Sequence, residues 1–243
     1  MTRRTFRQTL LCKADVTLDR TLDAQRVMQM RFASPAAKSA DAQAIKQGGT
    51  MELKTSGGVN VQIGHRITIA AMLHLARIWP LNIDFDSLLS AARASLSADA
   101  VVLQNASEFE QDRQTLAENL LQSFIAGVIE LHTIPASYVG EVSDVPEACP
   151  LARYQATQGE AIATRRHQLL PLDPLTQHLV QHLDGATSHQ GLLDRMVAYV
   201  AQSDVVLQHQ GEAVTETSKI QAILQQKLLP NLKRLAECGL LIG

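Results

Sequence analysis

Two short stretches of the sequence decide the predicted fold: Ala126-Gly127-Val128-Ile129 and Cys238-Gly239-Leu240-Leu241. In each, a glycine follows an apolar helical pattern and precedes an apolar run. That order is typical of a helix that ends at a left-handed residue and continues as a strand. Upstream of each stretch lie a buried first helix, a short second helix, an intervening segment and a long third helix. The sequence therefore predicts the plan of a winged-helix unit twice.

The first unit is predicted to contain a hairpin and three helices. Residues 51–55 and 59–63 alternate apolar and polar side chains around Ser56-Gly57-Gly58, which suits a tight turn. The stretch from Ile67 to Trp79 is apolar nearly all round, so we expect a buried helix that Pro80 ends. Asp84 or Asp86 can cap a short second helix, and a longer third helix begins at about Asp112. The third helix carries an apolar stripe made of Leu116, Leu120, Leu121, Phe124 and Val128.

The second unit is predicted to repeat this order. Asp173-Pro174 starts its first helix with a capping aspartate and a proline at the first position, and Gly185 ends it. A second helix carries residues 192–200, and residues 205–214 suggest a small hairpin. The third helix contains Pro230, which we expect to kink it or split it in two.

The remaining segments set the predicted domain boundaries. Phe6 to Cys12 alternates as a strand, residues 33–49 resemble a surface loop, and residues 133–165 carry three prolines with little helical period. We predict a strand and linker over 1–50, units over 51–133 and 166–243, and a linker over 134–165. The predicted fold class is mainly α with small β-hairpins (α+β), built as two tandem winged-helix-like units.

Composition excludes several classes of protein. The chain has 243 residues, of which 46% are hydrophobic and 19% charged, so it can bury a core. A formal net charge of -2 argues against a protein that mainly grips nucleic acid or an anionic membrane, and 4% aromatic residues are few for stacking platforms. The sequence shows neither a signal peptide nor a membrane span, and its three cysteines lie far apart. These features predict a cytoplasmic protein with reduced thiols.

Histidines are the first candidates for chemistry. His178 and His182 share one helix face and His189 follows, a spacing that could hold a metal in a small metalloenzyme. The simpler interpretation is that the first two face solvent, opposite the leucine stripe. We expect His167 to lie at a strand end near the cap of the next helix, and His65 and His74 to lie at or in the first buried helix.

The other motifs do not specify a reaction. The aspartates are explained as helix caps, turns or surface charges, and no nucleophile elbow, phosphate-binding loop, zinc-protease motif or paired C-x-x-C is present. We therefore predict no catalytic, cofactor-binding or metal residue in this chain.

A winged-helix plan also raises the hypothesis of a DNA-binding regulator. The third helix of the first unit has no basic excess, whereas that of the second is more basic, with one acidic residue, Glu237, against Lys219, Lys227, Lys233 and Arg234. DNA readers concentrate positive charge, because neutralising phosphates drives binding. On an acidic chain, these cations more often form a solvated face, so we expect no nucleic-acid partner.

Four blocks of the sequence resemble the methyltransferase regulatory domain family, and the resemblance covers the chain from residue 3 to the C-terminus. The first comprises residues 6–12, Asp19-Arg20 and Phe32-Ala33-Ser34-Pro35. The second is Trp79-Pro80 with residues 85–89, and the third is residues 141–143 with 150–153. The fourth is His167 with Leu172-Asp173-Pro174 and Leu183-Asp184-Gly185.

The resemblance implies a non-catalytic region. In that family the region follows a class I S-adenosylmethionine-dependent methyltransferase domain, and some members are similar to bacterial protein-lysine methyltransferases. Such a domain needs a glycine-rich turn after its first strand and an acidic ribose-binding residue, and this chain has neither. The resemblance thus implies a regulatory, substrate-engaging module. Its partners would be a class I domain that carries the S-adenosylmethionine, in cis or in trans, and a protein substrate. The strand around Phe6 would dock on that domain or pair within this chain.

Overall fold

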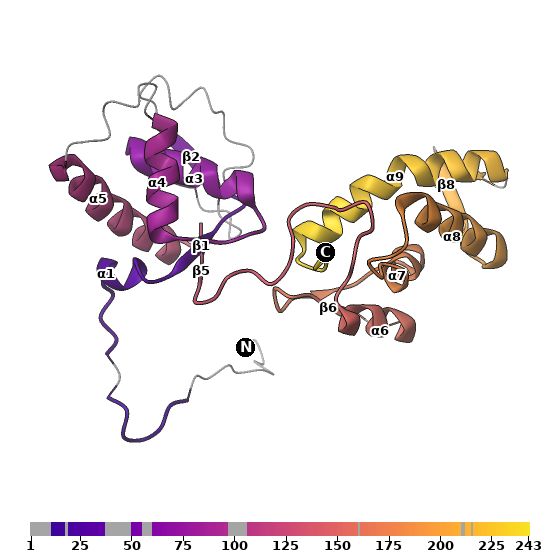
Figure 1. Cartoon of the computed structure of the whole chain (residues 1–243), viewed down its shortest axis with the longest axis horizontal. Helices are drawn as coiled ribbons and strands as arrows, with labels where there is room; N and C mark the ends of the chain where they lie inside the picture. Colours follow the sequence, from indigo (N-terminus) through magenta and orange to yellow (C-terminus); the bar gives the residue numbers. More distant parts are fainter. Residues whose placement is uncertain are drawn as a thin grey trace, which may run out of the picture.

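The protein forms two mainly helical units that lie side by side, and the chain crosses between them after strand β5 (Figure 1). A computed structural model describes residues 11–17, 19–36, 50–54, 60–96, 106–159, 161–209, 212–214 and 216–243. Each unit has its own cluster of buried apolar side chains. The predicted fold class, mainly α with small hairpins, is confirmed.

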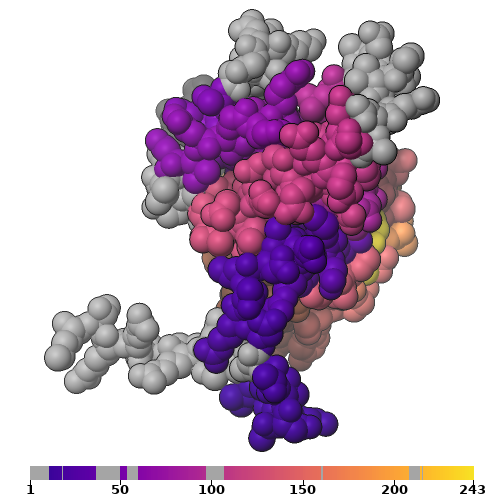
Figure 2. Space-filling view, turned by 90° about the vertical axis from the view of Figure 1, so that its left-hand side faces the viewer, coloured from indigo at the N-terminus to yellow at the C-terminus, as the bar shows by residue number. Residues whose placement is uncertain are grey.

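The first unit packs three long helices beside two small sheets. Its elements are α1 (Ala24–Val27), β1 (Arg31–Ala33), β2 (Met51–Lys54), β3 (Asn60–Ile63), α3 (Arg66–Ile78), β4 (Ile83–Asp84), α4 (Phe85–Leu96), α5 (Ala106–Ile125) and β5 (Glu130–His132). One antiparallel sheet has the order β4-β1-β5, with Arg31 opposite both Asp84 and His132. The other is the hairpin β2–β3, with Met51 opposite Ile63. Short α1 lies against α5 on the face shown in Figure 2.

Most predictions for the first unit are confirmed. The hairpin forms, α3 buries seven of its side chains, and the Asp84 carboxylate caps α4 by accepting the Ser87 N–H at 2.9 Å. Gly127 has a φ of 73°, the left-handed conformation expected after α5. Helix α5 begins at Ala106 rather than at about Asp112, because its first turns are polar and lack the apolar period. Elements α1 and β1 were not predicted, because four and three residues are too few to show a hydrophobic period.

In its described residues, the second unit packs helices around a core flanked by two short antiparallel strand pairs and two isolated β-bridges. Its elements are α6 (Pro150–Gln158), β6 (Ile162–Ala163), β7 (Leu169–Leu170), α7 (Pro174–Gln181), α8 (His189–Gln202), β8 (Leu207–His209), β9 (Glu212–Val214) and α9 (Thr217–Glu237). The Asp173 carboxylate caps α7 by accepting the Thr176 N–H at 3.0 Å, as predicted. Helix α9 continues through Pro230 without splitting.

The predicted linker over 134–165 is corrected in part, because it contains helix α6 and strand β6. Pro150 is the first helical residue, where its missing N–H costs nothing, and not a breaker. The helix buries only two small side chains, Ala152 and Ala156, so its apolar stripe is faint in the sequence. Counting α6, the third helix of this unit is α8, which directly precedes the hairpin β8–β9.

The two ends of the chain differ from their predicted strands. Residues 6–10 of the predicted N-terminal strand lie outside the described residues, and Leu11, next in the sequence, is 89% exposed and in no strand. At the other end, the predicted exit strand is a single antiparallel bridge between Leu241 and Ala148. This bridge ties the C-terminus to the start of α6.

Candidate functional site

A buried arginine joins the two units. Arg166, from the turn between β6 and β7, places its guanidinium carbon 4.0 Å from the centre of the Trp79 ring at the end of α3. One of its nitrogens, Nη2, donates to both carboxylate oxygens of Glu130 in β5, at 2.8 and 3.0 Å. The Arg166 side chain is only 5% exposed. An ion pair and a cation–π contact therefore connect the first core to the second unit.

Further contacts close around this arginine. The Tyr138 hydroxyl donates to the Pro80 carbonyl oxygen at 3.1 Å, and the same carbonyl accepts from Arg166 at 3.4 Å. Gly239 has a φ of 70°, and a Cβ atom there would lie 2.7 Å from Arg166 Cγ. The glycine that ends α9 is thus needed for its backbone and for the space that Arg166 occupies. This junction therefore holds the units together.

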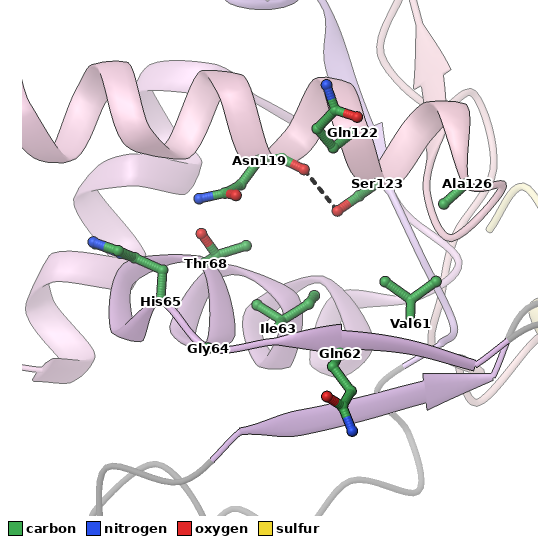
Figure 3. A pocket seen from close by; sticks show the side chains of 10 residues that line it. All are labelled: Val61, Gln62, Ile63, Gly64, His65, Thr68, Asn119, Gln122, Ser123 and Ala126. Atoms are coloured by element: carbon green, nitrogen blue, oxygen red, sulfur yellow. Dashed lines mark hydrogen bonds between the residues drawn. The ribbon is translucent and has the colours of Figure 1, made fainter.

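A hollow of about 280 Å³ opens between the hairpin, the start of α3 and the second half of α5 (Figure 3). Residues 61–65 and Thr68 form one side of the lining. Asn119, Gln122, Ser123 and Ala126 form the other. The Ser123 hydroxyl donates to the Asn119 carbonyl at 2.7 Å, so its hydrogen is already used within α5. The Thr68 hydroxyl is buried and has no hydrogen-bond partner among the described residues.

The structure corrects the expected solvent exposure of His178 and His182. Their rings contact edge to face with centres 4.7 Å apart, and His178 stacks on Tyr199 of α8 at 4.1 Å. Arg195 Nη1 lies 2.7 Å from His182 Nδ1, and because a guanidinium only donates, this Nδ1 is the acceptor. Both imidazoles are half-buried and pack α7 against α8.

The surroundings of these two rings favour their neutral forms. Burial lowers the pKa of His178 below its ordinary value of 6.5. Burial also lowers the pKa of His182, and the neighbouring His178 and Arg195 lower it further. His189, the third residue of the metal hypothesis, hydrogen-bonds instead to the Ser143 carbonyl oxygen at 3.0 Å. In the described part of the chain, no group of three or more His, Cys, Asp or Glu side chains is placed to hold a metal.

The other predicted histidines have local roles. His65 occupies the N-cap position of α3 but makes no side-chain capping bond. His74 accepts from Arg77 at 3.0 Å, and burial, followed by the charge of Arg77, lowers its pKa. His167 lies in the β6–β7 turn, two residues before β7, with a φ of 57°.

The cations considered for DNA binding lie on α9, outside the helix pair α7–α8 that precedes the hairpin. Lys219, Lys227, Lys233 and Arg234 are exposed, and Lys219 pairs with Glu216 at 2.8 Å. A helix-turn-helix reader uses its second helix, which here is α8, and α8 carries one acidic and one basic residue, Asp194 and Arg195. None of the described helices is long and apolar enough to cross a membrane.

Residues 144–240 match the family described as PKMT, C-terminal winged helix domain. The second unit is a PKMT-related region, where PKMT denotes protein lysine methyltransferase. Its matched residues begin just before α6 and end just after α9. They include α6, which the predicted boundary at 166 excludes. No curated protein matches the chain in sequence.

Two solved structures resemble almost the whole chain, beyond the PKMT-related region. Both are of PKMT2 from Rickettsia typhi, one of them in complex with AdoHcy. Each aligns with 96% of this chain at a TM-score of 0.75 and 12% sequence identity, which shows a shared fold. This chain spans 46% of that protein, so it corresponds to about half of its length.

Sequence reasoning missed both the junction and the hollow. Trp79 belongs to one of the blocks that carry the family resemblance, and so does His167, the residue after Arg166. The sequence thus marked two positions at the junction but did not indicate that they meet. The hollow had no signal, because its lining is made of common neutral residues from three separate elements.

Proposed function

We propose that this chain is the non-catalytic, substrate-engaging region of a class I S-adenosylmethionine-dependent methyltransferase that modifies a protein. Its partners would be the class I domain, which binds the cofactor, and the acceptor protein. The cytoplasm is the proposed location. The single observation that supports this most is the match of residues 144–240 to the PKMT C-terminal winged helix domain.

Three further observations support the proposal. The fold likeness to PKMT2 extends over both units, so they are suited to act as one module. The Arg166 junction gives that module a defined internal geometry, which a platform for a large substrate needs. The glycine-rich, strand-ending turn of a class I cofactor site does not occur in the sequence.

A reconstitution assay tests this function. The coding sequence next to this chain is searched for a class I domain, which is then expressed alone, mixed with this chain, and fused to it. With labelled S-adenosylmethionine and a lysate of protein acceptors, we expect transfer by the mixture and the fusion to exceed transfer by the class I domain alone. We expect none from this chain alone. Equal transfer with and without the chain would contradict a substrate-engaging role.

A further inference from the structure

A polar cleft of about 360 Å³ lies between α1 and the first half of α5, the two helices that meet on the face shown in Figure 2. Six described residues line this cleft: Gln25, Met28, Gln29, Glu110, Arg113 and Gln114. Arg113 is the one cation among these six and Glu110 the one anion. The cleft is separate from the hollow, whose lining residues on α5 begin at Asn119. It therefore brings one charge of each sign to the seam between two helices.

Arg113 has no counter-charge in the described structure. Its Nε atom is buried and has no hydrogen-bond partner, and no ion pair of its guanidinium is described. Arg93 of α4, by contrast, pairs with Asp112. A cation that is partly withdrawn from water without a counter-charge is costly to the free protein. The Arg113 side chain lines the cleft although its Nε is covered, so a carboxylate bound there would provide the missing charge.

Glu110 places the opposite charge beside this arginine. Its exposed side chain precedes Arg113 by three positions, so both residues lie on one face of α5, with about 5–6 Å between their Cβ atoms. The two are not paired with each other, and Glu110 has no other ion pair among those described. The described cleft thus presents a positive and a negative charge, neither of them neutralised, one helical turn apart.

The open walls decide what kind of molecule carries the matching charges. Four of the six lining residues are exposed, and the other two, Met28 and Arg113, are half-buried. A small-molecule site encloses most of its ligand, which these walls do not. Gln25 and Gln29 add uncharged amide donors and acceptors along the rim. The cleft therefore suits side chains that the surface of another protein presents.

From the two unneutralised charges we infer that the cleft between α1 and α5 binds a mixed-charge segment of a partner protein. A carboxylate of the segment would pair with Arg113, and a lysine ammonium beside it would pair with Glu110. In an extended segment, side chains two positions apart share one side at roughly 6.6 Å, which is close to the spacing of the two charges on α5. A purely acidic segment is disfavoured, because Glu110 repels it. Identifying the segment with the acceptor protein rests on the proposed function; the charge pairing itself does not.

The test uses the whole, isotope-labelled chain and the blocked peptide Ala-Glu-Ala-Lys-Ala. We expect this peptide to shift the NMR signals of residues 25–29 and 110–114 saturably at low salt, and to bind more weakly as salt is raised. Two control peptides remove one charge each, with glutamine in place of the glutamate or norleucine in place of the lysine. We expect each control to bind about tenfold more weakly. A mixture of acetate and methylammonium, which carries the same charges on separate small molecules, should not produce these shifts.

Matched variants on α5 assign the two charges. Arg113→Gln and Glu110→Gln should each weaken binding of the parent peptide about tenfold, and each should have no further effect on the peptide that already lacks the matching charge. Glu108→Gln is the control, because Glu108 lies on α5 outside this lining, and we expect it to leave the affinity unchanged. The urea midpoint of the free chain should not fall in Arg113→Gln, because its guanidinium has no described partner to lose.

Several outcomes would overturn the inference. They are the absence of saturable shifts up to about 10 mM peptide, equal affinity for all three peptides, equal effects of the three variants, or equal shifts with acetate and methylammonium. A large fall in the urea midpoint of Arg113→Gln would show that the guanidinium is paired within the free chain. A dimer, seen by sedimentation and lost in Arg113→Gln, would assign the cleft to a second copy of the chain. Either result would also overturn the inference. None of these outcomes decides the reconstitution assay, so the two proposals can fail separately.

Discussion

The two units place their hairpins differently. In the first, β2–β3 precedes the three long helices α3, α4 and α5, whereas in the second, β8–β9 follows α8 and is followed by α9. The two units also differ in how the hydroxyl group of a buried threonine is hydrogen-bonded. Thr176 in the second unit donates its hydroxyl to the Asp173 cap at 2.6 Å, while Thr68 in the first has no such partner. The comparison teaches that a capping aspartate three residues earlier satisfies one buried threonine, whereas the other, without such a neighbour, has no described partner.

The largest expected effect is at the junction between the units. Arg166→Ala removes the ion pair to Glu130 and the contact with Trp79, and it leaves Glu130 with His132 alone, whose Nε2 lies 3.2 Å from the carboxylate. Because Glu130 is 42% exposed, we expect a loss of about 2–3 kcal/mol, below the range for a fully buried pair. Calorimetric unfolding should then separate into two transitions, one for each unit.

The neighbouring Arg165→Ala serves as the control for the junction. Arg165 is exposed, and the one described hydrogen bond of its side chain is donated to the Ser137 carbonyl oxygen at 3.2 Å. We expect it to change the free energy of unfolding by less than about 1 kcal/mol and to leave one transition. If both variants unfold alike, Arg166 does not couple the units.

The next effect compares two glycines that follow helices in the second unit. Gly239→Ala introduces a Cβ atom 2.7 Å from Arg166 Cγ at a φ of 70°, and we expect it to destabilise the chain by roughly 2–3 kcal/mol. Gly159→Ala has a similar φ of 74° but no atom within 4 Å, so it should cost only about 1 kcal/mol. Urea unfolding measures both, and equal costs would mean that the space beside Arg166 is not needed.

A smaller effect, opposite in sign between the units, is expected at the two threonines. Thr68→Val replaces an unpaired buried hydroxyl by a methyl group, and we expect it to stabilise the free chain by about 1 kcal/mol. Thr176→Val breaks the bond to Asp173 and should destabilise it by about 1–2 kcal/mol. Urea midpoints compare the two variants, and destabilisation by Thr68→Val would show that its hydroxyl is satisfied in solution.

The smallest effect is the acid sensitivity of the second unit. The folded-state pKa values of His178 and His182 lie below the ordinary 6.5. At a pH between the folded-state value and 6.5, the unfolded chain therefore binds more protons than the folded chain. Stability is therefore complete above about pH 6.5 and falls slightly as the pH drops below it. Replacing both residues by glutamine should remove this part of the pH dependence, measured by urea midpoints from pH 5 to 7. His189→Gln, outside the stack, should not.

Local structure could be predicted well from the sequence, whereas long-range contacts could not. Gly127 and Gly239 adopt the left-handed conformation that their position after a helix requires, and Asp84 and Asp173 cap the helices that follow them. Helix α6 was missed because Pro150 was interpreted as a breaker and two buried alanines make a weak stripe. That omission also shifted the third helix of the second unit from α8 to α9.

The candidate sites were harder to predict because they depend on distant residues. Trp79, Glu130 and Arg166 meet across 87 positions of the chain, and no local pattern links them. The hollow lies between the hairpin, α3 and α5, so it depends on the tertiary arrangement of three separate elements. Conversely, the histidine spacing that suggested a metal proved to be a packing contact between α7 and α8.

The most direct test of the central claim is a calorimetric titration of the isolated chain with S-adenosylmethionine. The claim is that this chain is the non-catalytic part of a methyltransferase, so no glycine-rich cofactor site lies within it. The predicted result is no heat of binding, even at high ligand concentration. Saturable binding of one cofactor per chain with a micromolar Kd would contradict it.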